Sequence, residues 1–451
     1  MDRPPNFILI NCDDLGYGDL GCYGSAKNST PALDRLAQEG VRFTDFCMAS
    51  AVCSPSRGAM LTGCYPPRIG FGSFEGRHVL FPGQGVGLSS DEDTLAGVLK
   101  TGGYATQMVG KWHCGDQPEF LPTRHGFDHY FGLPYSNDMG RQEGRNPQSP
   151  PLPLLRDEEV IEEQPDQACL IERYVEESVR FMRANRGRPF FLYLAHMQVH
   201  LPIYAPERFH KQSRNGRYGA AVESVDWSVD VLLWELAQLG LREKTLVVFT
   251  SDNGSRGKDG GSNGALRGHK GTPWEGGFRV PCLMYWPGTL APGRVCRAPL
   301  ASIDFLPTFA SLAGVAWQAD RIDGCDASAL IRGETDAELS RRAFFYYAGD
   351  QLCAVRAGRW KLHVWRETGP ELFDLETDPG ETRNEYAKHP GLVRDMEKLL
   401  AECREDLGDN SRGIPGQGRR PIGRVAQARP LTEFHPDRPY YMAEYDLPDA
   451  G

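Results

Sequence analysis

The sequence predicts an α/β fold in which a large, mostly parallel sheet flanked by helices is followed by a smaller domain with an antiparallel sheet and a helix. Two observations predict this fold. Between residue 6 and about residue 315, short apolar runs alternate with amphipathic stretches, which is the pattern of strands joined by crossover helices. After about residue 340, the apolar runs follow one another directly and are separated by turn residues, which is typical of antiparallel strands. A chain of 451 residues is long enough for both units.

Three helices of the first unit have clear local signals. Thr30 can cap a helix that Pro31 opens and that Gly40 stops. Residues 168–185 and 218–239 carry apolar side chains at helical spacing. We therefore expect these three segments to cover the faces of the parallel sheet.

The second unit is predicted to contain four strands, a helix and an extended tail. The strands are residues 343–347, 352–355, 360–364 and 371–375, and the helix spans residues 391–405. From Asn410 onward the chain is rich in Pro, Gly and Arg and has no periodicity, so it should run as an extended arm over the surface or into a neighbouring subunit of a homo-oligomer. The predicted boundaries are residues 1–338, 339–409 and 410–451.

Four apolar runs of the first unit end in residues that can do chemistry. Residues 7–11 precede Asp13 and Asp14, and residues 105–109 precede Lys111 and His113. Residues 190–195 precede His196 and His200, and residues 246–250 precede Asp252 and Asn253. The carboxyl ends of parallel strands lie along one edge of an open sheet, where such folds bind ligands. We therefore expect these side chains to converge on one crevice.

Oxygen donors dominate part of that set. Asp13, Asp14, Asp252 and Asn253 offer carboxylate and amide oxygens, which suit a hard divalent cation better than zinc. Calcium is the expected ion, with Mg²⁺ as the alternative. The competing interpretation is that each pair merely stabilises a turn, as acidic and amide side chains often do.

The composition restricts the classes of partner and the compartment. A formal net charge of −10 argues against a protein that coats nucleic acid or an acidic membrane, so an anionic substrate would need a local basic pocket. The apolar runs are far shorter than the roughly 20 residues of a membrane helix. The twelve cysteines include no CxxC pair and indicate scattered thiols. The start MDRPPN leaves no room for a signal peptide, which predicts a cytoplasmic protein unless a leader was removed, in which case it is periplasmic or secreted.

Residues 53–63, CSPSRGAMLTG, resemble the signature of the sulfatase family, in which the cysteine is oxidised to formylglycine. Further segments resemble family motifs of the arylsulfatase A type: NCDDLGYGDLGCYG at 11–24, GKWHCG at 110–115, SDNG at 251–254, HKGTPWEGG at 269–277 and LFDLETDPGE at 372–381. Cys12 departs from the pattern, since relatives often carry another small or apolar residue there. The resemblance implies an alkaline-phosphatase-like fold and the hydrolysis of sulfate esters.

The resemblance also implies a role for each site residue. Asp13, Asp14, Asp252 and Asn253 would hold the metal together with the formylglycine at Cys53, whose maturation requires a formylglycine-generating enzyme. Arg57 would fix the loop and compensate negative charge at the metal, and Lys111 and Lys270 would grip the sulfate. His113 would take the proton from the second hydroxyl of the aldehyde hydrate, His200 or Lys270 would protonate the leaving alcohol, and Asp252 would help deprotonate the attacking hydroxyl. Ser136 matches a position at the sulfate site, whereas His196 and His269 receive no catalytic role.

Two other functions remain open at the level of the sequence. A phosphate or phosphonate ester hydrolase of the same superfamily would use a similar fold, although one metal with several cations suits the lower charge of a sulfate monoester. A non-catalytic binder of sulfated glycans would keep Cys53 as a thiol.

The substrate is predicted from weaker resemblances. GRYGAAVESVD at 216–226, GGSNG at 260–264 and FFYYAGDQL at 344–352 look most like N-acetylgalactosamine-6-sulfatases, which implies a 6-sulfated sugar of the galactose type. Residues 71–78, Trp112, Trp274 and the tail are the candidate lining of the leaving-group pocket.

Overall fold

The computed structural model describes residues 4–142, 145–334, 339–437, 443 and 445–451. Its centre is a ten-stranded mixed sheet with the strand order β12-β2-β11-β10-β1-β9-β5-β6-β7-β8. In that order the strands are Arg294–Cys296, Val41–Phe43, Cys282–Tyr285, Thr245–Ser251, Asn6–Cys12, Phe190–Ala195, Ala105–Gly110, His129–Gly132, Pro153–Arg156 and Glu159–Glu163. The five strands from β10 to β6 run parallel, and antiparallel strands lie on both sides of them. The predicted mostly parallel sheet is therefore confirmed.

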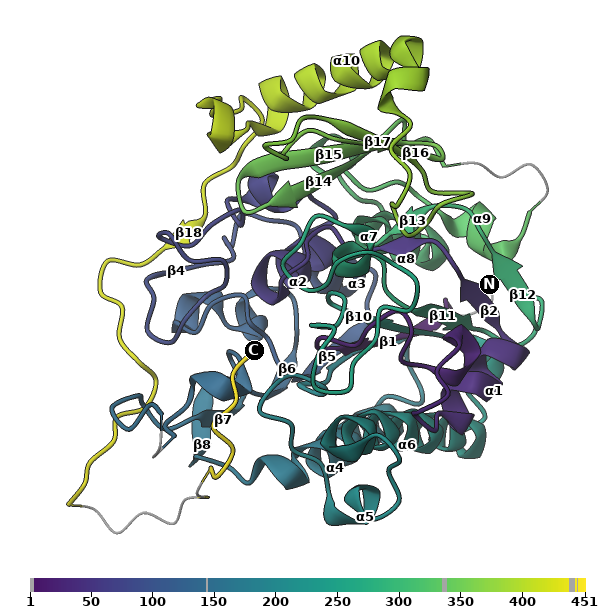
Figure 1. Cartoon of the computed structure of the whole chain (residues 1–451). Helices are drawn as coiled ribbons and strands as arrows, with labels where there is room; N and C mark the ends of the chain where they lie inside the picture. Colours follow the sequence, from purple (N-terminus) through teal and green to yellow (C-terminus); the bar gives the residue numbers. More distant parts are fainter. Residues whose placement is uncertain (1–3, 143–144, 335–338, 438–442, 444) are drawn as a thin grey trace.

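Helices cover both faces of this sheet (Figure 1). α1 (Pro31–Glu39), α4 (Leu170–Ala184) and α6 (Gly216–Gln238) lie on one face, and α2 (Cys53–Thr62), α3 (Leu95–Thr101) and α8 (Phe305–Ala313) lie on the other. The alternation of strand β1 explains how both faces are filled. Phe7 and Leu9 pack into the core of the α3 and α8 face, whereas Ile8 and Ile10 pack into the core of the α4 and α6 face. Each fully buried side chain of this kind contributes about 1.5–3 kcal/mol to the free energy of unfolding.

The three helices predicted from local signals are present. α1 begins at Pro31 and ends just before Gly40, and α4 and α6 end within three residues of the predicted bounds. Thr30 plays a different role from the one its position suggested. Its hydroxyl accepts a hydrogen bond from the Gly21 amide at 2.8 Å and caps no amide of α1, so it ties the preceding loop to the helix start.

The small domain is a four-stranded antiparallel sheet in sequence order, covered by one helix. Its elements are β14 (Phe344–Ala348), β15 (Gln351–Ala357), β16 (Trp360–His363), β17 (Glu371–Asp374) and α10 (Pro390–Leu407). These elements match the predicted strands and helix. The boundary predicted between residues 338 and 339 adjoins residues 335–338, which lie outside the described residues, so the exact domain limits stay a prediction.

The remaining elements are short. They include β3 (Phe46–Cys47), β4 (Val86–Gly87), β13 (Leu300–Ala301), β18 (Gly423–Arg424), α5 (Glu207–His210), α7 (Glu275–Phe278) and α9 (Ser328–Arg332). β18 lies in the tail and pairs antiparallel with β4, which fixes the tail to the larger domain. All twelve cysteines are free thiols. Within the described part of the chain, every helix is too short or too polar to span a bilayer.

A buried ion cluster joins the two domains near the site. Lys361 on β16 is fully buried, and its Nζ lies 2.9 Å from Glu275 Oε1 and 3.0 Å from Glu381 Oε1. Tyr346 donates a further hydrogen bond to Glu275 at 2.8 Å. Burial by itself would raise the pKa of Glu275, but the charges of Lys361 and Arg356 outweigh it and hold the pKa at about 2. Because Glu275 follows the loop that carries Lys270, the cluster anchors that loop to the small domain.

We expect Lys361→Ala to lower the free energy of unfolding by about 3–5 kcal/mol, because two carboxylates would be left buried without their cation. The matched control is Lys398→Ala, since Lys398 is exposed and forms a surface ion pair with Asp395, so its loss should change the stability by at most about 1 kcal/mol. Urea unfolding followed by tryptophan fluorescence measures both values. Equal stability losses in the two variants would contradict a structural role for the cluster.

Candidate functional site

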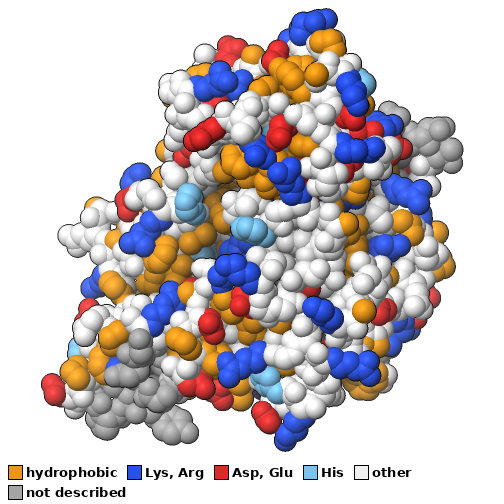
Figure 2. All heavy atoms as spheres, in the orientation of Figure 1, with side chains coloured by type: hydrophobic (Ala, Val, Ile, Leu, Met, Phe, Trp, Pro, Cys, Tyr) orange, Lys and Arg blue, Asp and Glu red, His pale blue; other side chains and the backbone are white. Residues whose placement is uncertain are grey.

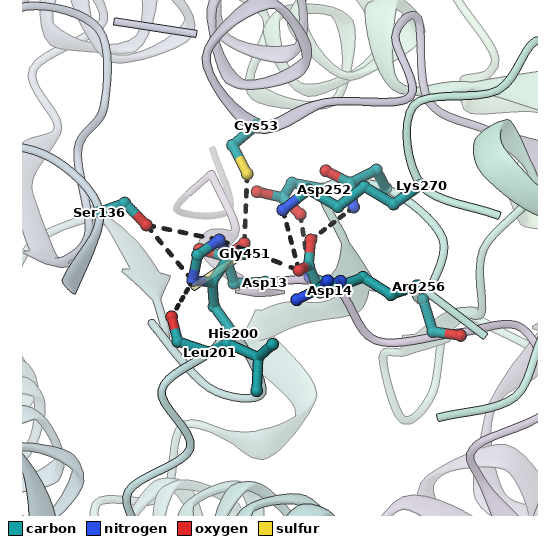
Figure 3. Close-up of polar contacts among 12 residues, drawn as sticks. Asp13, Asp14, Cys53, Ser136, His200, Leu201, Asp252, Arg256, Lys270 and Gly451 are labelled. Atoms are coloured by element: carbon teal, nitrogen blue, oxygen red, sulfur yellow. Dashed lines mark hydrogen bonds and ion pairs between the residues drawn. The ribbon is translucent and has the colours of Figure 1, made fainter. Parts of the chain in front are cut away.

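The polar residues that follow four strands converge at one edge of the sheet, as the sequence predicted. Strands β10, β1, β9 and β5 are direct neighbours, and β1 pairs in parallel with β9 and β10. Their carboxyl ends therefore bring together Asp252 and Asn253, Asp13 and Asp14, His200, and Lys111 with His113. Figure 3 shows the central side chains of this group pointing toward one another. On the surface, Figure 2 shows a hollow on this face with Lys, Arg and His side chains near it.

The centre of the site is a group of ligand atoms that could hold a cation. Single ligand atoms of Asp13, Asp14, Cys53 and His200 all lie within 4.8 Å of one another. Asn253 donates from Nδ2 to Asp14 Oδ1 at 2.8 Å, while its buried Oδ1 has no hydrogen-bond partner among the described residues. An unpaired buried amide oxygen beside carboxylates is the kind of donor that a hard divalent cation takes as a ligand. The residues present therefore fit such an ion.

Buried cations balance the carboxylates. Arg57 is fully buried, donates from Nε to Asp252 Oδ2 at 2.8 Å, and its Nη2 lies 3.3 Å from Asp13 Oδ2. Lys111 Nζ contacts Asp13 Oδ2 and donates to Ser136 Oγ at 3.2 Å, and Lys270 Nζ donates to Asp14 Oδ2 at 2.9 Å. Each of the two aspartates that follow β1 therefore contacts an ammonium group.

Burial and nearby charges shift the pKa values of Asp13 and Asp252 in opposite directions. Burial would raise the pKa of Asp13, but the charges of Lys111, His200 and Arg57 hold that pKa well below its usual range. Burial, followed by the nearby charge of Asp13, raises the pKa of Asp252 to about 6. Asp13 is thus the firmly ionised centre of the group.

Cys53 is the first residue of α2, and every residue of this helix is buried. Its Sγ lies 3.3 Å from Asp13 Oδ1. Burial and then the charge of Asp13 raise the pKa of the thiol well above its usual value. Ser54 and Ser56 hold the helix start in place, because the Ser54 hydroxyl accepts from the Leu80 amide at 3.1 Å and the Ser56 hydroxyl donates to the Asp252 carbonyl. An unmodified Cys53 is therefore a protonated thiol in a rigid position rather than a reactive thiolate.

His113 is held as a neutral imidazole with one free nitrogen. Its Nε2 lies 2.9 Å from the Leu80 carbonyl, so this nitrogen carries the proton and Nδ1 keeps a lone pair. Nδ1 is buried and has no hydrogen-bond partner in the described part of the chain. Burial, followed by the charge of Lys111, lowers the pKa of His113 well below its usual value. The residue also has a φ of 59°, an uncommon conformation that aims its side chain. This arrangement suits a proton acceptor.

His200 differs from His113 in the ring nitrogen that it uses to contact a backbone carbonyl, which is Nδ1 in His200. Nδ1 lies 2.5 Å from the Leu201 carbonyl and 3.2 Å from Asn137 Oδ1, so Nδ1 donates to these acceptors. Nε2 lies 3.9 Å from Asp14 Oδ2, and Ser136 Oγ lies beside the ring, 3.4 Å from Nδ1 and 3.5 Å from Nε2. His200 therefore turns Nε2 toward the group of carboxylates and cations.

Several residues proposed as pocket lining lie elsewhere. Trp112 is fully buried and donates from Nε1 to the Phe120 carbonyl at 2.8 Å, and Trp274 packs against His363 and Phe373 of the small domain. Phe71 also belongs to the buried core of the larger domain, as does Phe74. Those assignments were wrong because large aromatic side chains beside a polar motif gained more from burial in the core than from exposure to the cleft.

The two histidines without a predicted role stand apart from the site chemistry. His196 is fully buried, with Nε2 2.9 Å from the Ser228 hydroxyl, and burial lowers its pKa to about 3. His269 is exposed.

Two polar residues at the edge of the site were missed by the sequence analysis. Asp138 lies next to Asn137, whose side chain contacts His200, and Arg256 follows Asn253 by three residues. Both contact the end of the tail, at residues 450 and 451. Their positions inside GLPYSND and just after SDNG were the available signals, because a charged residue beside a metal motif has a high chance of facing the same crevice.

The chain is similar in sequence and in structure to proteins named as sulfatases. The sulfatase family model matches residues 5–315, and a model described as N-sulphoglucosamine sulphohydrolase, C-terminal, matches residues 269–406. The chain is 42% identical to dog (Canis lupus familiaris) N-acetylgalactosamine-6-sulfatase, covering 90% of this chain and 81% of the relative, and 40% identical to human (Homo sapiens) arylsulfatase A, covering 92% and 85%. The solved structure of Ps i-CgsB in complex with k-i-k-neocarrahexaose is 29% identical, covers 94% of this chain and 96% of that chain, and superposes with a TM-score of 0.79.

We expect Asn253→Ala to weaken the binding of a divalent cation at least about tenfold, because the variant removes one oxygen ligand without removing a charge. The measurement is the metal content after dialysis, together with the rise in melting temperature on adding Ca²⁺. Asn185→Ala is the matched control, since Asn185 caps α4 far along the chain from the site motifs. Wild-type metal content in Asn253→Ala would remove this residue from the ligand set.

Proposed function

The chain belongs to the sulfatase family and is a sulfuric ester hydrolase, and we propose that it cleaves sulfate monoesters through a formylglycine made from Cys53 beside a bound calcium ion. The observation that carries the proposal is the position of Cys53 at the start of a buried helix, 3.3 Å from the Asp13 carboxylate. A thiol there has its pKa raised, so it is a poor nucleophile as it stands. Oxidation of Cys53 by a formylglycine-generating enzyme would turn this inert position into a reactive one.

Formylglycine in its hydrated form carries two hydroxyl groups on one carbon, one to attack sulfur and one to release the sulfate afterwards. Calcium would be held by Asp13, Asp14, Asp252 and Asn253, with magnesium as the alternative ion. When bound, the cation would stabilise negative charge on the sulfate oxygens as the ester bond breaks. Arg57 would keep Asp13 and Asp252 ionised and in place, because it is buried between them.

The remaining steps are assigned to side chains of the site. Lys111, Lys270 and Ser136 would hold the sulfate oxygens, since the two ammonium groups and the hydroxyl lie around the carboxylate group. His113 would accept the proton of the second hydroxyl at Nδ1, the nitrogen that keeps its lone pair. His200 would donate a proton to the leaving alcohol from Nε2 as an imidazolium, protonated at both nitrogens, because its Nδ1–H stays bonded to the Leu201 carbonyl and neutral His200 carries no proton on Nε2. Lys270 is the alternative donor.

The substrate that we propose is a 6-sulfated sugar of the galactose or N-acetylgalactosamine type. Support comes from the 42% identity to an N-acetylgalactosamine-6-sulfatase over 90% of this chain. Aryl sulfates should also be turned over, because they need few contacts beyond the sulfate site.

We expect Cys53→Ala to abolish hydrolysis of an aryl sulfate, with a rate below about one thousandth of the wild-type rate, because the nucleophile is lost. The mass of the wild-type peptide that contains residue 53 should lie about 18 daltons below that of the unmodified cysteine peptide. Cys353→Ala, which alters a buried thiol of the small domain, is the control and should retain activity. An unmodified thiol in a fully active preparation would refute the formylglycine, and an unmodified thiol without activity would favour the glycan binder.

We expect N-acetylgalactosamine 6-sulfate and galactose 6-sulfate to release sulfate faster than their 4-sulfated isomers, because the leaving group must enter one fixed site. Released sulfate is measured by ion chromatography. An aryl phosphate serves as the comparison for the rival hydrolase, and faster turnover of the phosphate than of the aryl sulfate would favour that rival.

A further inference from the structure

The end of the tail lies on the candidate site. Tyr445 and Leu447 are buried: the Tyr445 hydroxyl donates to the Pro165 carbonyl at 2.7 Å, and the Leu447 carbonyl accepts from Gln142 Nε2 at 3.2 Å. The residues beyond this anchor are exposed or half-buried and reach across to the catalytic groups. Figure 3 shows Gly451 beside His200. We call residues 448–451 the tip.

Two charged side chains hold opposite edges of one peptide group in the tip. The Ala450 carbonyl accepts from Arg256 Nη1 at 2.6 Å, and the Gly451 amide donates to Asp138 Oδ2 at 3.3 Å. This carbonyl and this amide belong to the same planar peptide unit, where the C=O and N–H groups point in opposite directions. Arg256 and Asp138 therefore form a clamp that fits a trans secondary amide.

The clamp adjoins the reacting groups. A Cβ built on Gly451 would lie 2.1 Å from both Cε1 and Nε2 of His200, so the tip lies against the imidazole and a larger residue would require the ring or the tip to shift. Nε2 is the nitrogen assigned above to protonate the leaving alcohol. A leaving group that reaches His200 must therefore take the place of the tip.

One carboxylate oxygen of Asp138 is available to accept a hydrogen bond from a ligand. Its side chain is about nine-tenths buried, with a relative exposure of 8%, and its Oδ1 makes no hydrogen bond within residues 4–142, 145–334, 339–437, 443 and 445–451. A buried carboxylate oxygen without a partner is unfavourable unless a ligand supplies the missing donor. The tip satisfies only one of the two oxygens.

We infer that Arg256 and Asp138 are specificity-determining residues that recognise an acetamido group on the leaving sugar, and that the Ala450–Gly451 peptide occupies their place when the sugar is absent. The acetamido group of an N-acetylated hexosamine is a trans secondary amide, with the same carbonyl acceptor and N–H donor as the peptide that the clamp holds. The hydroxyl of a plain hexose at that position can both donate and accept, but its one oxygen cannot reach two residues that bind opposite edges of an amide. This inference rests on the proposed function, because it assigns the leaving group of that reaction.

The first experiment measures how N-acetylgalactosamine and galactose inhibit hydrolysis of an aryl sulfate, because the two sugars differ only at the acetamido group. We expect the wild-type protein to bind N-acetylgalactosamine about tenfold to hundredfold more tightly than galactose. Asp138→Ala and Arg256→Ala should each reduce this preference to less than about threefold, while turnover of the aryl sulfate stays within about threefold of wild type, since neither residue is among the side chains assigned to the sulfate. Arg256→Lys should restore part of the preference.

Matched controls are Asp91→Ala and Arg297→Ala, which remove exposed residues of the same types and should keep the full preference. Equal inhibition by the two sugars in the wild-type protein overturns the inference, as does a preference that survives both clamp variants. If the wild-type protein leaves the aryl sulfate intact, the proposed function fails, and the clamp is then tested by direct calorimetric binding of the two sugars.

The second experiment removes the tip. Deletion of residues 448–451 should lower the inhibition constant of N-acetylgalactosamine severalfold and leave kcat for the aryl sulfate unchanged, because the occupant of the clamp is removed while the anchor at Tyr445 and Leu447 stays. Gly451→Ala should lower the same inhibition constant, because its Cβ would overlap the place of the His200 ring and displace the tip. Pro448→Ala is the control for a neutral change in the tip. An unchanged or raised inhibition constant in both tip variants overturns the competition between tip and sugar.

Discussion

The site depends on the ionisation of Asp13 at a position that the protein shields from bulk solvent. Asp13 is fully buried, and burial alone would neutralise it. Lys111 and Arg57 prevent this because both contact Oδ2 of its carboxylate, and Arg57 is shared with Asp252. A buried carboxylate stays charged only when cations and hydrogen bonds compensate its lost hydration. Loss of this compensation would neutralise the carboxylate that Lys111, Arg57 and the Cys53 thiol all contact.

The sheet makes this arrangement rigid. Asp13 follows the central strand β1, whose neighbours β9 and β10 carry His200 and Asp252 just beyond their ends. Parallel pairing fixes these strand ends side by side, and both faces of the sheet are filled by helices. The small domain adds to the rigidity through Lys361, which forms a buried ion pair with Glu275. Glu275 follows the loop that carries Lys270, so the pair also fixes that loop. Charged groups can thus be packed closely because the backbone that carries them has no freedom to separate them.

Particular residues show how far the sequence could be interpreted. Asp13, Lys111, His200 and Asp252 each follow an apolar run, so their meeting at one edge could be predicted from strand direction alone. Trp112 and Trp274 were wrongly assigned to the pocket, since sequence position next to a motif says nothing about which way a side chain turns. Asp138 and Arg256 were missed because their shared partner, the tip of the tail, lies about 200 residues or more away along the chain.

The sequence by itself determined the fold class, the family resemblance and the identity of the metal-ligand and nucleophile candidates, because these depend on local patterns: alternating apolar runs, capped helices and short motifs. Only the tertiary structure decided the tautomers of His113 and His200, the burial of Cys53 and the placement of residues 448–451 over the site. Those features depend on which carbonyl, charge or chain segment lies opposite each group, and such contacts form between residues that no local pattern connects.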